Sequence, residues 1–305
     1  MEETKQEIGD KEDGIEEFIT ANRVKINSKL EEILKQDQEI VGKETLDAAT
    51  YVVLDNGHRW RPLLAIAAYK ALTKNRNDHQ EENDSDDILN AACAVEFLHS
   101  ASLIYDDIMD KSELRRGKPT CHIRYGEPVA LLAFAYLVSR ADLLFSKINS
   151  DISSLSELKF LAINGMIYGQ TMDVTGNVKD ESSLLKAHKL KSAIYTLASE
   201  VAWVIFKADE ITLKAITDYS EKIGIAYLIE DDILDVESTQ EESGKPVGQD
   251  KRLRKFTAVD AYGIDGAKTK MQEYVSQAKQ AIANVPNNQL LIAFVDYMFS
   301  NKKAK

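Results

Sequence analysis

Two short acidic motifs of the same spacing constrain this chain more than any other feature of its sequence. Each reads Asp-Asp-x-x-Asp, and each follows an apolar run with helical periodicity. The two trios are Asp106, Asp107 and Asp110, and Asp231, Asp232 and Asp235. Residues three or four positions apart share one face of a helix, so each trio gathers like charges near the negative end of the helix dipole. Both trios therefore need a cation to offset their repulsion.

A hard divalent metal ion is the cation that suits carboxylate oxygens. Mg²⁺ in proteins usually binds one or two carboxylates together with phosphate oxygens of a substrate. Arg115 and Arg116 follow the first motif, and guanidinium groups bind phosphate as rigid forks. Lysines and arginines also follow the second motif. One motif alone could be a solvated acidic helix end beside a basic turn. Two copies on facing helices favour a Mg²⁺ cluster that clamps a diphosphate and neutralises it as it leaves.

Seven motifs, in order between about Tyr51 and Phe256, resemble those of the trans-polyprenyl diphosphate synthases, geranylgeranyl diphosphate synthases in particular. They are NGHRWRP (56–62), HSASLIYDDIMD (99–110), RRGKPT (115–120), GQTMD (169–173), KSA (191–193), EDDILD (230–235) and GKPVGQD (244–250). The resemblance implies isoprenoid biosynthesis: a prenyltransferase that condenses isopentenyl diphosphate with an allylic diphosphate. It also implies Mg²⁺ held by the six aspartates, and a homodimer.

The same resemblance assigns roles to further residues. Lys191 and Ser192 are expected beside the allylic diphosphate and the developing carbocation, as the catalytic residues. The residues expected to bind the substrates are His58, Arg61, His99, Arg115, Arg116, Gln170, Lys245 and Lys255. Without the resemblance, His99 reads as a core histidine and Lys191 as an exposed helical lysine. We expect Arg59 to pair with acidic neighbours and His188 to lie at the surface.

Three positions depart from the family pattern. His58 stands where the family usually has lysine, Tyr227-Leu228 stands in place of Phe-Gln, and Gln249 replaces the second lysine of the loop after the second motif. The first departure falls at the expected isopentenyl diphosphate site, where histidine would bind phosphate less strongly than lysine at high pH.

Two alternative functions stay open. A class I terpene cyclase also ionises a prenyl diphosphate at an Asp-Asp-x-x-Asp motif, but it usually carries a second metal motif of the Asn/Ser/Glu type, which differs from the second motif here. A non-catalytic partner subunit of a prenyl synthase would be marked by loss of aspartates, whereas this chain retains all six.

The residues one helical turn before Asp106 predict the product length. Ala101 and Ser102 lie there, about 5.4 Å back along the axis. In the family, an aromatic residue at either place forms a floor that stops growth near 15 carbons. Both are small here, so we expect a product of 20 or more carbons. Phe134 is the other candidate floor, because the family often has Gly-Asp where this chain has Phe134-Ala135.

The fold predicted is all-α. Helical periodicity recurs along the chain, no β pattern occurs, and no linker rich in proline, glycine or serine divides its 305 residues. We predict an acidic flexible tail over 1–14 and one polyprenyl synthase domain over 15–305, which the resemblance makes a helical bundle with a central cavity. Helices are expected over 15–46, 62–72, 87–105, 128–147, 156–174 and 184–207, with at least two more between 258 and 299.

The net charge and the two cysteines indicate which binding partners and which cellular compartment to expect. The net charge of −12 argues against non-specific binding to nucleic acid or to an anionic membrane. Cys93 and Cys121 have no metal-binding or redox spacing and are expected to stay reduced. The first residues lack an apolar signal region, and we expect no apolar run of the ~18–20 residues that would span a bilayer. The sequence therefore predicts a cytoplasmic protein.

Overall fold

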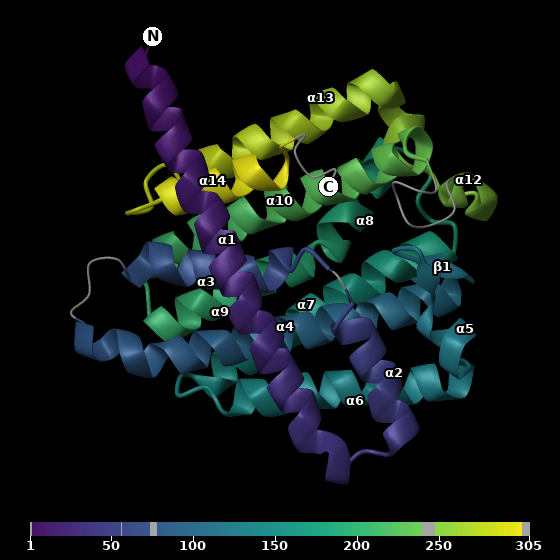
Figure 1. The fold of residues 1–305 in the computed structure, drawn as a ribbon. Coiled ribbons are helices and arrows are strands. Elements are labelled where there is room, and N and C mark those ends of the chain that lie inside the picture. Colours follow the sequence, from purple (N-terminus) through teal and green to yellow (C-terminus); the bar gives the residue numbers. More distant parts are fainter. Residues whose placement is uncertain (1, 56, 74–77, 240–247, 301–305) are drawn as a thin grey trace.

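A computed structural model describes residues 2–55, 57–73, 78–239 and 248–300, and most of them lie in helices (Figure 1). The helices are α1 (Glu2–Gln36), the 3-10 helix η1 (Asp37–Glu39), α2 (Lys43–Val53), α3 (Trp60–Thr73), α4 (Asp78–Met109), α5 (Cys121–Tyr125), α6 (Glu127–Ser146), α7 (Ile152–Val174), α8 (Glu181–Lys191), α9 (Ala193–Phe206), α10 (Glu210–Glu237), α12 (Gln249–Leu253), α13 (Ala258–Ala281) and α14 (Gln289–Met298). Two-residue strands, β1 (Leu114–Arg115) and β2 (Lys118–Pro119), pair antiparallel. The all-α prediction is confirmed.

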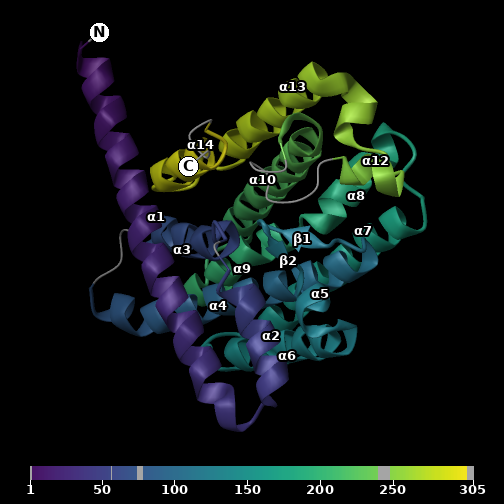
Figure 2. The same ribbon diagram turned by 45° about the vertical axis from the view of Figure 1, so that its right-hand side comes forward.

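The helices stack in layers, with the longest apolar helices in the middle. Helix α4 packs against α3, α6 and α9, and α10 packs against α9 and α13. In both views α13 and α14 cover α10 on one side, α6 lies on the opposite side, and α1 crosses the layers (Figures 1 and 2). Helix α3 is apolar on almost every side, and almost all of its side chains are buried.

Helices α4 and α10 carry their apolar faces through the core and end at the aspartates. Residues Ala91–Leu98 of α4 are buried without a break, and Ile223, Ala226 and Ile229 of α10 are fully buried. Their burial fixes both helices relative to the rest of the bundle. The carboxylates at their ends are therefore held by the core rather than by a loop.

The stretch predicted as one helix over 184–207 forms two helices that meet at Ser192. Ser192 is only 1% exposed, and its hydroxyl donates to the carbonyl of Lys189 at 2.8 Å. A Cβ at Gly224 of α10 would come within 2.3 Å of the Ser192 Cβ, so glycine allows α10 to pack directly on the junction. Apolar periodicity continues through the junction, which is why it did not reveal the break.

Three other helix boundaries differ from the sequence prediction. The stretch 15–46 is not one helix, because α1 ends at Gln36 and α2 begins after Gly42. Helix α4 begins at Asp78, nine residues before the start at 87 that the sequence predicted. Helix α1 begins at Glu2, within the predicted tail. The flexibility of 1–14 and a single domain over 15–305 stay predictions.

Two of the described helices are long and apolar enough to span a membrane by length and composition, although the sequence led us to expect none. They are Asp86–Met109, within α4, and Glu127–Ser146, which is α6. The apolar window of the first is 67% buried inside the bundle and that of the second 39%. Core helices of soluble proteins pass the same test, so it does not establish a membrane span.

Candidate active site

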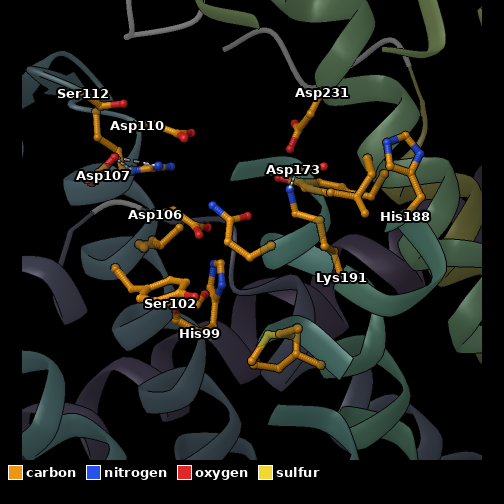
Figure 3. A pocket seen from close by; sticks show the side chains of 18 of the residues that line it. His99, Ser102, Asp106, Asp107, Asp110, Ser112, Asp173, His188, Lys191 and Asp231 are labelled. Atoms are coloured by element: carbon orange, nitrogen blue, oxygen red, sulfur yellow. Dashed lines mark hydrogen bonds and ion pairs between the residues drawn. The ribbon is translucent and has the colours of Figure 1, made fainter. Parts of the chain in front are cut away.

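The two aspartate trios lie on the wall of one cavity of 610 Å³. Asp106 and Asp107 occupy the last turn of α4, and Asp110 follows directly; the second trio lies near the C-terminus of α10. Figure 3 shows the α4 aspartates on one side of the cavity, with Asp231, Asp173 and Lys191 on the other. Two helix ends that are far apart in the sequence therefore supply one acidic site.

Most of the cations at this site are paired with carboxylates. The Arg115 guanidinium donates to both carboxylate oxygens of Asp107, at 2.8–3.0 Å. Lys255 Nζ lies 2.8 Å from an oxygen of Asp110, and Lys191 Nζ contacts Asp173. These pairs hold the side chains at the cavity and partly neutralise their charge, while each cation keeps further N–H groups that could donate to a phosphate.

Burial makes two of the six carboxylates costly to ionise. Desolvation raises the pKa of Asp106 to about 6, although Lys191 and Arg115 act in the opposite direction. Desolvation also raises the pKa of Asp232 to about 8. The backbone N–H of Ala258, which donates to this carboxylate at 2.7 Å, acts in the opposite direction and lowers the pKa. A divalent cation near these oxygens would favour their charged form.

The donor set suits Mg²⁺ that is shared with a substrate. It consists of carboxylate oxygens, which hard cations prefer. Within the described ranges, no group of three or more acidic, histidine or cysteine side chains is placed to hold a metal ion by itself. Ions at this site would therefore complete their coordination with oxygens of another molecule, as Mg²⁺ does when it binds phosphate.

The segments that follow the two trios contact each other at the mouth of the cavity. Ser112 Oγ donates to Gln249 Oε1 at 3.2 Å, and Arg252 donates to the carbonyl of Asp110 at 3.3 Å. Gln249 and Asp250 in turn donate their backbone N–H groups to the Asp235 carboxylate, each at 3.2 Å. These hydrogen bonds join the two acidic ends into one rim.

A second polar group, with one cation and a neutral histidine, lies deeper along the same cavity. Arg61 of α3 and His99 of α4 line it, with Arg61 Nη1 3.1 Å from His99 Nε2. Burial, and then the charge of Arg61, hold the pKa of His99 well below its usual range, so this imidazole is neutral. Gln170 of α7 also lines the cavity and is 3% exposed; its Oε1 has no hydrogen-bond partner in the described structure.

Arg116 lies in the tight turn between β1 and β2. Arg116 and Gly117 both have positive φ, of 51° and 76°, a combination typical of a two-residue hairpin turn. Arg116 also pairs with Asp55 at 3.4 Å. A Cβ at Gly57 would come within 2.9 Å of the Arg116 guanidinium, so glycine there lets the loop before α3 close on it.

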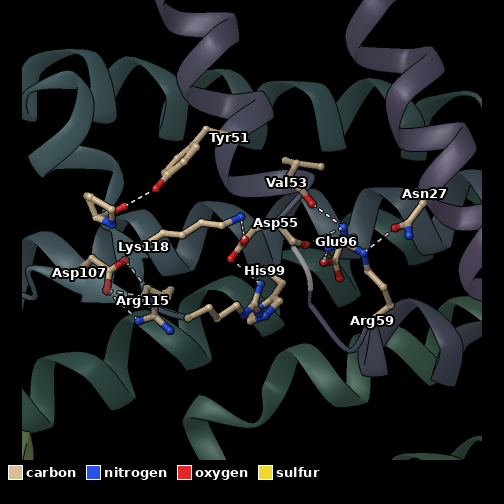
Figure 4. A network of polar contacts seen from close by, with 12 residues as sticks. Asn27, Tyr51, Val53, Asp55, Arg59, Glu96, His99, Asp107, Arg115 and Lys118 are labelled. Carbon is tan, nitrogen blue, oxygen red and sulfur yellow. Dashed lines mark hydrogen bonds and ion pairs between the residues drawn. The ribbon is translucent and has the colours of Figure 1, made fainter. Parts of the chain in front are cut away.

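A buried network fixes the loop that precedes α3 (Figure 4). Arg59 has a φ of 60° and is 5% exposed; it donates to Glu96 of α4 at 2.5 Å, to Asn27 of α1 and to the carbonyl of Val53. The expected pairing of Arg59 with an acidic neighbour is confirmed. Because Arg61 follows two residues later, this network also sets where Arg61 enters the cavity.

Beyond the charged mouth the cavity is apolar. Tyr105 and Phe134 of α6 line it with their rings stacked, 6.1 Å between centroids at 23°. The other apolar or small lining residues of this part are Leu98, Ala101, Ser102, Val138, Ile163 and Met166. A cavity with a cationic and acidic mouth and an apolar depth suits a molecule with an anionic head and a hydrocarbon tail.

Two of the predicted site residues that the structure describes do not line this cavity. His58 is exposed and stacks on Trp60, with centroids 5.4 Å apart at 11°. Ser192 is buried against Gly224, as described above, which gives it a packing role. Lys245 lies outside the described residues. All the other predicted site residues line the cavity.

Several residues at this site were not predicted as site residues, among them Tyr227 and His188, which line the cavity, and Tyr195, which contacts Arg61. Tyr195 and Tyr227 contact Arg61, and His188 was expected at the surface. His188 is instead 7% exposed and lines the cavity, with Nε2 3.6 Å from Asp232; burial lowers its pKa to about 3. For His188 its helical spacing was a usable signal, since it lies three residues before Lys191 on the same helix, α8.

Comparison with protein families agrees with this geometry. The Polyprenyl synthetase family model matches residues 43–291. A farnesyl diphosphate synthase of Haemophilus influenzae is 32% identical over 84% of this chain and 88% of its own length. The chloroplastic geranylgeranyl pyrophosphate synthase of Capsicum annuum is 33% identical over 92% of this chain and 77% of its own.

Solved structures with the same fold include two with bound ligands. A polyprenyl synthase from Caulobacter crescentus, complexed with calcium and isoprenyl diphosphate, has a TM-score of 0.81 and 25% identity, over 94% of this chain and 96% of its own. A geranyltransferase from Helicobacter pylori, complexed with magnesium and isoprenyl diphosphate, has a TM-score of 0.80 and 26% identity, over 92% and 97%. Both were solved with a divalent cation and a diphosphate.

Proposed function

This chain belongs to the polyprenyl synthetase family and is a prenyltransferase, and we propose that it joins isopentenyl diphosphate to an allylic diphosphate, head to tail, with Mg²⁺ as cofactor. One observation carries the proposal: the two aspartate trios face one cavity that also holds Arg61, Arg115, Arg116 and Lys191 and continues into an apolar depth. That arrangement matches two anionic heads and a hydrocarbon tail.

The acidic end of the cavity and the end at Arg61 have different roles in this reaction. Mg²⁺ held by Asp106, Asp110, Asp231 and Asp235 would supply positive charge at the leaving diphosphate. Lys191 and Arg115 lie beside these aspartates, and their remaining N–H groups donate to the oxygens of the allylic diphosphate. The apolar walls keep water from the allylic carbocation.

The isopentenyl diphosphate is placed deeper, between Arg61, Arg116 and His99. Its double bond attacks the carbocation, a carbon–carbon bond forms, and a proton is then lost. Gln170 lies on the wall of the same cavity, and its side-chain carbonyl oxygen has no hydrogen-bond partner in the described structure. We propose the released diphosphate as the base, since His99 is occupied by Arg61 and His188 by Asp232.

We further propose a product of 20 or more carbons. The names of the relatives include farnesyl as well as geranylgeranyl synthases, so the product length depends on this cavity. The proposal is supported by Ala101 and Ser102, which lie on its wall and leave room beside α4. The ring of Phe134, on α6, stacks on that of Tyr105, on α4, and both rings line the same space.

We propose that the enzyme is a homodimer formed through α6 and α7. The exposed face of these helices carries large apolar side chains that are between 48% and 61% exposed: Leu131, Leu132, Phe160, Leu161 and Tyr168. Such a face favours a protein contact. Light scattering should give twice the mass of one chain, and Leu132→Glu with Phe160→Glu should give the monomer; an unchanged mass would place the contact elsewhere.

A cytoplasmic location is part of the same proposal. Both cysteines are buried and free of a disulfide, and burial raises the pKa of Cys93 to about 12, so neither thiol is reactive. Fractionation of the source cells, with the protein followed by antibody, tests this; recovery in a membrane pellet would contradict it.

One assay tests the function. The purified protein is incubated with Mg²⁺, isopentenyl diphosphate and each allylic primer of 5, 10, 15 or 20 carbons, and the products are sized. We expect linear diphosphates of 20 or more carbons. Cyclic hydrocarbons formed from a prenyl diphosphate alone would indicate a terpene cyclase. Absence of turnover with every primer, restored by a second synthase chain, would indicate a partner subunit.

A further inference from the structure

Arg61 differs from the other arginines of the cavity in what holds it. Arg115 pairs with Asp107 and Arg116 pairs with Asp55. In the part of the chain that the structure describes, Arg61 has no ion pair with a carboxylate, and its Nε is buried without a hydrogen-bond partner. No carboxylate of the described residues therefore pairs with its positive charge, although Asp231 and Glu230 act electrostatically on both neighbouring tyrosines.

Two tyrosines from different helices surround this guanidinium. Arg61 Cζ lies 4.3 Å from the centroid of the Tyr195 ring of α9 and 5.8 Å from that of Tyr227 of α10. The two rings lie 5.8 Å apart at 50°. Both distances are within the range in which the face of an aromatic ring attracts a cation. Tyr195 is 1% exposed, so the contact is shielded from water.

The third partner of Arg61 is uncharged as well. His99 Nε2 lies 3.1 Å from Arg61 Nη1, and a neutral imidazole accepts a hydrogen bond there. Two π faces and one lone pair thus fix the orientation of the guanidinium without cancelling its charge. A carboxylate in the same place would fix it too, but would compete with an incoming diphosphate for the same N–H groups.

We propose that Tyr195 and Tyr227 are positioning residues that hold Arg61 as an uncompensated cation for the diphosphate of isopentenyl diphosphate. The proposal rests on the function proposed above. It assigns the effect to the aromatic faces and not to the hydroxyl groups, because the Tyr195 hydroxyl has no hydrogen-bond partner in the described structure. Tyr227, which stands where related sequences usually have phenylalanine, retains the ring that the contact needs.

Ring electronics can be changed without a change of size. Full-length protein is made with tyrosine, phenylalanine, or mono-, di- and trifluorinated phenylalanine at position 195, because fluorine weakens the negative face of the ring. Binding of isopentenyl diphosphate is measured by calorimetry, and KM and kcat are measured in turnover. We expect Tyr195→Phe to bind within about twofold of the unmodified protein. Each added fluorine should weaken binding, up to about threefold to tenfold in total, with the KM of the allylic substrate unchanged.

Position 227 supplies the second series. Tyr227→Phe should behave as the unmodified protein, and Tyr227→Leu should raise the dissociation constant of isopentenyl diphosphate by about threefold. Thermal unfolding of each variant separates loss of structure from loss of binding. Equal affinity across the fluorinated series, with folding intact, would overturn the inference. If the unmodified protein does not bind isopentenyl diphosphate at all, the proposed function fails instead.

Discussion

The two ends of the cavity hold their cations in different ways. At the acidic end, Arg115, Lys255 and Lys191 each contact a carboxylate. At the deeper end, Arg61 is held by two aromatic rings and a neutral histidine. The cations of the acidic end are therefore partly neutralised before any ligand binds, whereas Arg61 at the deeper end is oriented without a carboxylate partner in the described structure. Under the proposed function, this difference means that the charge of bound metal would matter most at the acidic end, whereas the fold alone orients Arg61.

The largest effect should follow loss of a metal-binding carboxylate. We expect Asp106→Ala or Asp231→Ala to lower kcat by at least about a hundredfold, because charge at the leaving diphosphate would no longer be neutralised. Circular dichroism should be unchanged, since removal of one of several repelling carboxylates does not weaken the core. Near-normal kcat in either variant, or after chelation with EDTA, would exclude the metal mechanism.

The next largest effect should separate binding of isopentenyl diphosphate at the deeper end from binding of the allylic substrate at the acidic end. Arg61→Gln should raise the KM of isopentenyl diphosphate by about tenfold to a hundredfold, because a charge-assisted bond to phosphate is lost. The KM of the allylic substrate should change little. Arg115→Gln, the matched control, should show the opposite pattern. Parallel changes of both KM values in both variants would mean that the two ends are not separate sites.

Much of this arrangement could be predicted from the sequence, for identifiable reasons. Helix α10 was predictable because its apolar residues recur at helical spacing. A metal site at the acidic trios was predictable because carboxylates so close together repel one another and require a cation. The aromatic contact of Arg61 was not, because Tyr195 and Tyr227 lie on different helices and meet only through packing. The position of Ser192 depends on Gly224, a residue with no side chain to form a pattern. The boundary at Gln36 was missed because periodicity resumes in α2.

Metal and diphosphate should stabilise the protein together more than either does alone. Since no three described ligand side chains are placed to hold an ion by themselves, Mg²⁺ alone should raise Tm by only about 1 °C. Mg²⁺ with inorganic diphosphate at many times its Kd should add about 3 kcal/mol, or several degrees. Asp231→Asn should remove most of this gain. An equal gain with Mg²⁺ alone would show a preformed metal site.

The apolar depth beneath the acidic end should set product length. Ala101 is 1% exposed on the cavity wall, so Ala101→Phe should block the space beside α4 and shift the main product to fewer carbons. Phe134→Ala should lengthen it, because the ring stacked on Tyr105 is removed. Chromatographic sizing with excess isopentenyl diphosphate measures both. A main product of 15 carbons from the unmodified enzyme would contradict the proposed length.

The smallest effect is expected at His58, where sequence and structure lead to different predictions. From the sequence, His58→Lys lowers the KM of isopentenyl diphosphate at pH 8, because lysine keeps its charge and histidine does not. In the structure His58 is exposed, stacks on Trp60 and does not line the cavity, whereas Arg61, three residues later, does. We therefore expect a change in KM of less than about twofold, as for other exposed charges that are screened by water and salt. His58→Ala is the control for loss of the ring stack. A tenfold fall in KM in His58→Lys alone would show that residue 58 reaches the diphosphate when substrate binds. The deeper end would then be organised partly by its ligand and not by the fold alone.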